Sequence, residues 1–371
     1  SEEANRLNKD IARHVKARFC LNEGTHYKYH DELEYASEAE KWLQMAATES
    51  DKLITSGRYE IYNTGHPQED YFNMYRIDDK SDLKEAVLYV DYKTNIREHN
   101  MAAAGREAGC GFSKSFVESF LCSDGLPISL SNKYLGDETM RKETANRDPR
   151  LKQLILTNDF PTNVTDDLKD STFVVNEDEF ITQHCFTGYR PIKGFNPIYS
   201  QALYMKSSFD GIAYRYAETL LINAEAKAEL NTITNADLDR TVNQLRDRVG
   251  MPHLTVNVGF TDPKWPDWGY SLSPVLQEIR RERCIELAGE GFRFNDLKRW
   301  KAGKLLNNVL TYVGKRKPDG NLAIVYPNYT NPDLSYQAGK SRTWEDKMYL
   351  YPIPTGELQR NPQLLPQNPG W

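Results

Sequence analysis

Apolar residues recur at helical spacing near the start of the chain. Residues 1–22 are therefore predicted to form an amphipathic helix that ends at Gly24. A second apolar stripe predicts another helix at about residues 35–57, and the short polar loop between the two predicts an antiparallel hairpin over residues 1–57. The residues expected on the buried face of the first helix are Leu7, Ile11, Val15 and Phe19.

Between residues 58 and 210 the apolar residues no longer recur at helical spacing and form only short runs. Strand-like segments at Ala86–Val90 and 154–156 alternate with turn signals such as Gly125 and Pro149. This pattern predicts an irregular, loop-rich region, which either carries function or simply packs as loops.

Helical periodicity returns over residues 211–302. Alanines are interspersed with Leu and Ile at 214–230, and such small residues let a neighbouring helix approach closely, as in tetratricopeptide-type hairpins. A partner helix is predicted at about 235–249, capped by Asn235, and a further pair at 273–289 and 294–302, opened by Ser273. Two stacked helical hairpins are therefore expected here.

The last segment, residues 303–371, is rich in Tyr, Pro, Asn and Gly. From about residue 311 this composition predicts no helix but an extended strap packed across the helices. The expected fold is mainly α, with tetratricopeptide-like hairpins at 1–57 and 211–302, a loop-rich middle at 58–210 and the C-terminal strap, together forming one domain.

Composition and charge exclude several classes of function. The net charge is -6, with basic and acidic residues interspersed, so a nucleic-acid-binding surface is not expected. No run approaches the ~20 apolar residues of a membrane-spanning helix. Neither a phosphate-binding loop nor ligand-spaced histidines occur, and no cofactor or metal is expected. The cysteines are odd in number and scattered, which predicts buried thiols and not a disulfide framework; they are Cys20, Cys110, Cys122, Cys185 and Cys284.

The densest cluster of charges lies between Ile279 and Trp300. Arg283 falls on the apolar face of this predicted helix and must be paired, with Glu286 and Glu290 as candidate partners. Alternatively, these two carboxylates could be the general acid and base of a glycoside hydrolase. Flanking arginines lower the pKa of a carboxyl group, which favours ion pairing over proton donation.

The same segment resembles the C-terminal helix of the SusD/RagB family. The matching residues are Ile279, Arg280, Glu282, Arg283, Glu286, Leu287, Glu290, Gly291, Arg293, Asp296, Leu297, Arg299 and Trp300. Gly289 departs from the family pattern, which usually has an aromatic residue there. Further ordered motifs, from Asp124–Gly125 through Arg147–Leu151 to Asn368–Gly370, extend the resemblance over nearly the whole chain.

The resemblance implies a non-enzymatic lipoprotein at the outer surface of the Gram-negative outer membrane. Such proteins capture a glycan, or a peptide in the RagB branch, and deliver it to a SusC-like TonB-dependent transporter. Family members usually begin with a signal peptide, a lipidated cysteine and further helices before the point that matches residues 7–21. We therefore expect this chain to be the larger, C-terminal part of the family pattern, with the lipid anchor in an N-terminal portion outside it.

Ligand capture is predicted from aromatic loops, because sugar rings stack on aromatic side chains. The clearest candidate is the segment 264–270, called the aromatic loop below, in which Trp265, Trp268 and Tyr270 are close in sequence. The same pattern is also typical of aromatics that cover helix ends. Tyr62 and Tyr71 are further candidate ligand-binding residues, for which core packing is the alternative, and Tyr134 and Phe160, which flank the Arg147–Leu151 motif, are two more.

Alternatives to glycan capture differ in the site that they need. Peptide capture would use backbone pairing in a roomier groove, a hydrolase would need two carboxylates in an open cleft, and a helical-repeat scaffold would bind no small ligand. We expect the charged segment 279–300 to be internal, which leaves capture to the aromatic loops.

Overall fold

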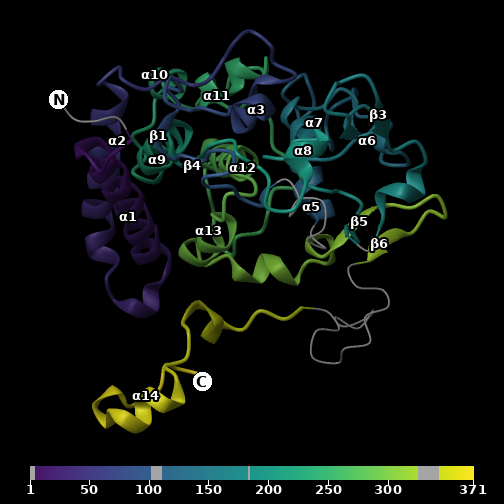
Figure 1. The fold of residues 1–371 in the computed structure, drawn as a ribbon. Helices are drawn as coiled ribbons and strands as arrows, with labels where there is room; N and C mark the ends of the chain where they lie inside the picture. Colours follow the sequence, from purple (N-terminus) through teal and green to yellow (C-terminus); the bar gives the residue numbers. More distant parts are fainter. Residues whose placement is uncertain (1–4, 102–110, 183, 325–341) are drawn as a thin grey trace.

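The computed structural model describes residues 5–101, 111–182, 184–324 and 342–371 and shows a mainly helical fold (Figure 1). α1 (Lys9–Tyr29) lies beside α2 (Ala39–Ile54), α2 packs on α9 (Tyr216–Glu229), and α9 packs on α12 (Pro274–Glu286). Helices distant in sequence therefore stack side by side, and the predicted mainly α class is confirmed. No helix in the described ranges is long and apolar enough to cross a membrane.

The first helix continues past its predicted end. Asn8 caps α1 by accepting hydrogen bonds from two backbone amides of the first turn. The predicted stop at Gly24 was wrong, because this glycine lies inside the helix at the crossing with α2. A Cβ atom at Gly24 would stand 2.8 Å from Leu43 of α2, so glycine allows the two helices to approach closely.

The predicted buried face of α1 was also wrong. Ile11 is buried, but Leu7, Val15 and Phe19 are 85%, 40% and 58% exposed. The buried face is rotated toward smaller side chains because these let α2 and α9 pack close to α1. The residues of this face include Ala17, Cys20, Leu21 and Gly24.

The C-terminal helices follow the predicted order with one difference. The single helix expected at 235–249 is two, α10 (Asn235–Asp239) and α11 (Val242–Arg248), because the backbone leaves helical geometry at Thr241. Thr234, not Asn235, caps α10 in a capping box. Ser273 caps α12 as predicted, and α13 (Arg293–Arg299) follows after a short turn.

The middle region consists of short elements. β1 (Ala86–Val90) pairs antiparallel with the distant β4 (Gly211–Arg215), and β2 (Pro161–Val164) pairs with β3 (Ser171–Phe173). The strand predicted at 154–156 was wrong, because Leu154 ends a helix and Ile155 makes only an isolated bridge to Pro191. The short helices here are α3 (Asp70–Asn73), α5 (Lys114–Glu118), α6 (Met140–Thr144), α7 (Arg150–Leu154) and α8 (Tyr199–Ala202).

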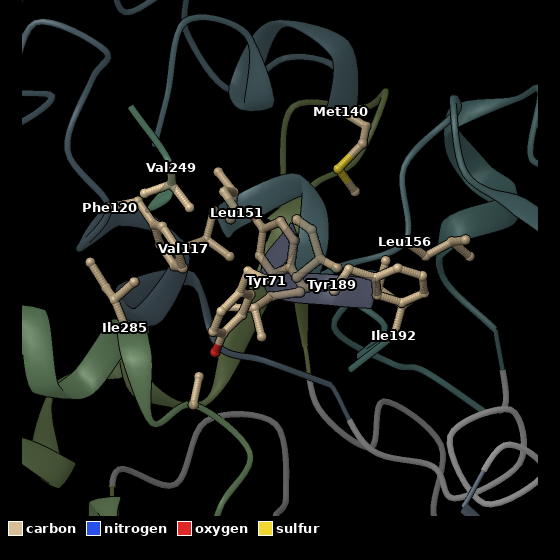
Figure 2. Packing of buried hydrophobic residues seen from close by; sticks show 14 of the residues in the cluster. Tyr71, Val117, Phe120, Met140, Leu151, Leu156, Tyr189, Ile192, Val249 and Ile285 are labelled. Atoms are coloured by element: carbon tan, nitrogen blue, oxygen red, sulfur yellow. The ribbon is translucent and has the colours of Figure 1, made fainter. Parts of the chain in front are cut away.

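A hydrophobic core joins the middle region to α12. Figure 2 shows Tyr71, Leu151 and Tyr189 packed among aliphatic side chains, with Ile285 of α12 at the same core. The thiols of Cys20, Cys122 and Cys185 are buried, as predicted, and that of Cys284 is half-buried. Cys110 lies outside the described residues.

The tail is not wholly extended. β5 (Val313–Arg316) pairs with β6 (Leu322–Ile324), and Figure 1 places α14 (Thr355–Arg360) apart from the other helices. The prediction of no helix after residue 311 was wrong, because the segment between Pro354 and Pro362 contains no proline and completes a short helix. Residues 325–341 of the predicted strap lie outside the described residues.

Candidate ligand-binding cavity

The charged segment is organised around one buried carboxylate. Glu286, at the end of α12, accepts hydrogen bonds from Arg150 (Nη1, 3.0 Å), Arg215 (Nη1, 2.6 Å) and Arg248 (Nη2, 2.5 Å). These arginines come from α7, the end of β4 and α11. One side chain therefore ties three distant segments to α12, and the four residues are called the Glu286 cluster below.

The Glu286 cluster offers no proton donor. Burial alone would raise the pKa of Glu286, but Arg248, Arg215 and Arg150 hold this pKa well below its usual range. Burial would also raise the pKa of Glu290, but Arg215 and Lys193 lower it below its usual value. Both carboxylates are thus stabilised as anions, as the sequence predicted, and neither is suited to protonate a glycosidic oxygen.

Arg283 is paired, but not with the predicted partners. Its Nε lies 2.9 Å from Asp296 Oδ2 and 3.8 Å from Glu225 Oε2. The chain reverses after α12 through Gly289 and Gly291, both at positive φ (+74° and +84°), and this turn brings Asp296 of α13 back against Arg283. The positive φ also accounts for glycine at position 289, where a larger residue would be strained.

The aromatic loop covers the first half of α12. Trp265 donates its Nε1 hydrogen to Glu278 (2.7 Å), and Trp268 donates to Gln277 (2.6 Å) while meeting Trp300 edge-on. Trp268 is only 6% exposed, so it presents no ring face for stacking, and its predicted role is not supported by this arrangement. Trp265 and Tyr270 are half-buried.

The other predicted aromatics are dispersed over the middle region. Tyr71 is fully buried and donates its hydroxyl hydrogen to the carbonyl of Glu286 (2.6 Å) (Figure 2), so it cannot contact a ligand in this structure. Tyr62, Tyr134 and Phe160 are half-buried, and the ring of Phe160 packs edge-on against a neighbouring phenylalanine. Ligand contacts of these three residues, and of Trp265 and Tyr270, stay predictions.

A cavity of about 1210 Å³ opens elsewhere among the described residues. We call it the α1–α13 cavity, because α1 forms one wall and the turn before α13, with α13 itself, forms another. The exposed Val15 and Phe19 of α1 lie on its surface, and so do Tyr349 and Leu350 from the tail. Further aromatic rings on its walls are Tyr75, Phe112, Phe209 and Phe292.

The polar groups of this cavity differ from those of the Glu286 cluster. Within the part of the chain that the structure describes, no hydrogen bond occupies the side chains of Asn22, Asn295 or Lys298. Burial, with a contribution from neighbouring His30, lowers the pKa of His26 to about 4, so its imidazole is neutral at neutral pH. These groups are available to donate to, or accept from, ligand hydroxyls.

The charged segment 279–300 also borders this cavity. Arg283, Glu290, Asp296 and Arg299 lie on its wall, but Arg283, Asp296 and Arg299 are each only 3% exposed. The expectation of an internal segment was wrong for the turn and the start of α13, where Gly289, Gly291 and residues 293–295 are exposed.

Comparison with known proteins identifies the family. Residues 48–371 match the model of the SusD family. The chain belongs to this family. The predicted SusD/RagB resemblance is thereby confirmed. A SusD-like protein of Bacteroides fragilis NCTC 9343 superimposes with a TM-score of 0.69 at 25% identity, covering 100% of this chain and 66% of that one.

Two further relatives agree with the SusD assignment. A SusD-like carbohydrate-binding protein of the same organism gives a TM-score of 0.65 at 22% identity, covering 98% of this chain and 66% of the other. SusD-like protein P2 of Formosa agariphila is 33% identical over 166 residues, which are 45% of this chain and 27% of that protein. The chain thus spans less than two thirds of the length of these SusD relatives.

Proposed function

We propose that this SusD family member binds a glycan in the α1–α13 cavity at the outer surface of the outer membrane and passes it to a SusC-like TonB-dependent transporter. Membership of the family supports this proposal, and so does the solved relative that is described as carbohydrate-binding. The observation that carries it is a cavity that combines accessible aromatic rings with unoccupied amide groups.

This combination suits the chemistry of sugars. The apolar C–H faces of a pyranose stack on aromatic rings, here the exposed ring of Phe19, while its hydroxyls need partners that both donate and accept. Asn22 of α1 and Asn295 of α13 supply such amides, and Lys298 adds a donor. Because Glu286 and Glu290 are held as ion-paired anions, we propose binding without hydrolysis.

The test begins with a glycan array screened beside a peptide library. Calorimetry then compares the best glycan on the wild type and on Phe19→Ala, with Phe173→Ala, another exposed phenylalanine on β3, as the matched control. We expect Phe19→Ala to weaken binding by about fivefold, since stacking on an aromatic ring contributes on the order of 1 kcal/mol. Unchanged affinity would remove the cavity as the site, and binding of peptides alone would replace the glycan.

The aromatic loop is proposed as an outer contact through its half-buried residue Trp265. Trp265→Ala should lower the affinity for a long oligosaccharide more than that for a disaccharide. An equal fold-loss of affinity for both lengths would exclude that contact. Delivery is tested by affinity purification of the tagged protein from solubilised outer membranes, where a SusC-like transporter should be recovered with it.

A further inference from the structure

A second, smaller cavity lies at the ends of α1 and α9, next to the start of α12. Its volume is about 420 Å³, and none of the residues on its walls belongs to the α1–α13 cavity. Tyr29 and Tyr270 form one side of it. We call it the Tyr29–Tyr270 pocket. A pocket of this size accommodates a small ligand, whereas the larger cavity suits an extended one.

The two tyrosines are held in fixed positions. Their rings stack with centroids 4.3 Å apart and an interplanar angle of 19°. Tyr29 donates its hydroxyl hydrogen to Glu229 (2.6 Å), and Tyr270 donates to the carbonyl of Trp300. Because both hydroxyl groups are already bound, the rings would lose little conformational freedom when a ligand settles on them.

Unlike the two tyrosine hydroxyls, three polar side chains on the pocket walls are available to a ligand. Across the described ranges, no hydrogen bond or ion pair involves the side chains of Asp31, Asn231 or Ser271. Lys28 also lies on the wall, but its ammonium is bound to the carboxylate of Glu229 (2.8 Å). The available groups are therefore a carboxylate, an amide and a hydroxyl, with no available cation.

We propose that the Tyr29–Tyr270 pocket is a second binding site, which takes one or two neutral sugar units. Asp31 and Asn231 would accept and donate hydrogen bonds to vicinal hydroxyls, and the fixed tyrosine rings would contact the apolar edge of the sugar. The unpaired carboxylate of Asp31 disfavours anionic sugars. The sugar class rests on the proposed function, whereas the site itself rests on this separate geometry.

A second site would change how long a glycan stays bound. Binding of one part of a polysaccharide in the larger cavity raises the effective concentration of other parts of the same chain near the pocket, so two weak sites together retain a long glycan better than either alone. Short sugars would gain nothing from the pair.

The experiment uses the 371-residue chain and amide NMR shifts. The probes are maltose, cellobiose, lactose and xylobiose, with glucuronate as the anionic counterpart, each at concentrations on the order of 10 mM because single small sites bind weakly. We expect at least one neutral disaccharide to shift the amides near Asn231 and Ser271, and glucuronate to leave them unchanged. No shift with any neutral probe, or equal shifts with glucuronate, would overturn the proposal.

Variants separate this site from the larger cavity. The double variant Asp31→Ala with Asn231→Ala should weaken the shifts near Ser271 at least fivefold, whereas Asn132→Ala, an exposed amide elsewhere, should not. Phe19→Ala should leave these shifts intact. Shifts that survive Phe19→Ala but disappear in the double variant support the pocket even if the larger cavity fails its own test, and undiminished shifts in a folded double variant refute the pocket.

Discussion

The Glu286 cluster and the polar side of the α1–α13 cavity include residues that are close in sequence, but their polar groups differ: those of the cluster are buried and paired, and those of the cavity are available to a ligand. Glu286 is buried with three arginines around one carboxylate. Asn295 and Lys298, on the next helix, have no such partners within the described residues. The difference teaches that the densest charges of this chain hold the helices together, while its less conspicuous amides are the ones available to a ligand.

The strongest challenge to this comparison is Glu286→Gln. The substitution leaves three buried guanidinium groups facing a neutral amide, and we expect it to lower the free energy of unfolding by about 3–5 kcal/mol. Urea denaturation measures the effect, with Glu357→Gln on the exposed face of α14 as the control. A loss below about 1 kcal/mol, within the range of surface substitutions, would mean that the cluster does not hold the helices together.

Trp268→Ala tests whether this tryptophan stabilises the fold or binds the glycan. Trp268 is buried against Trp300, so its removal should cost about 3 kcal/mol of stability. Glycan affinity should remain unchanged at a temperature where the variant is folded. Thermal unfolding and calorimetry on the same sample decide whether this tryptophan is structural, and a loss of affinity without a loss of stability would reverse the assignment.

Acid should lower the stability that the ion pairs of Glu218 contribute before it changes glycan affinity in the α1–α13 cavity. Burial opposes ionisation of Glu218, but hydrogen bonds and charge from His14 and Arg18 lower its pKa to about 2. A depressed pKa contributes stability above the unfolded value of 4.5, and that contribution, about 3 kcal/mol, is lost as the pH falls from about 4.5 to 2.

Denaturation measured across this pH range should show the loss, and Glu218→Gln should flatten the profile. Glycan affinity should be constant between about pH 5 and 7, because the cavity amides do not titrate, His26 is already neutral there, and Lys193 on the cavity wall, whose pKa burial lowers to about 8, is still charged. A histidine-like step in the affinity would contradict the neutral imidazole.

The smallest expected effect is that of Asn295→Ala. Loss of one amide that hydrogen-bonds to sugar hydroxyls should weaken glycan binding by about fivefold, close to 1 kcal/mol, while stability changes by less than about 0.5 kcal/mol. Calorimetry measures the first quantity and urea denaturation the second. The opposite pattern would place Asn295 with the structural residues.

Much of the helical framework could be predicted because its signals are local. Ser273 followed by Pro274 predicts the start of α12, and alanines interspersed with leucines predict the buried helix α9. The end of α1 could not be predicted from Gly24, because a glycine that ends a helix and one that admits a neighbouring helix look alike in sequence, and only the contact with Leu43 separates them.

The candidate site was harder to predict. Charge density correctly indicated that Arg283 needed a carboxylate, but its partner Asp296 arrives through a turn whose direction depends on two glycines at positive φ. The walls of the α1–α13 cavity come from α1, α13 and the tail, which are far apart in sequence. Phe19 and Asn22 carried no signal beyond helical periodicity, and that periodicity assigned Phe19 to the core.

Arg280 sits among four aromatic rings, with its Cζ 4.4 Å from the centroid of Trp300, 4.7 Å from Trp268, 5.0 Å from Tyr29 and 5.8 Å from Tyr270. This arrangement couples both tyrosines of the smaller pocket to two indoles that emit light. Since indole emission depends on nearby charge and polarity, a ligand that settles on Tyr29 and Tyr270 beside Arg280 should change the intrinsic fluorescence. The chain thus contains a built-in optical reporter for occupancy of that pocket.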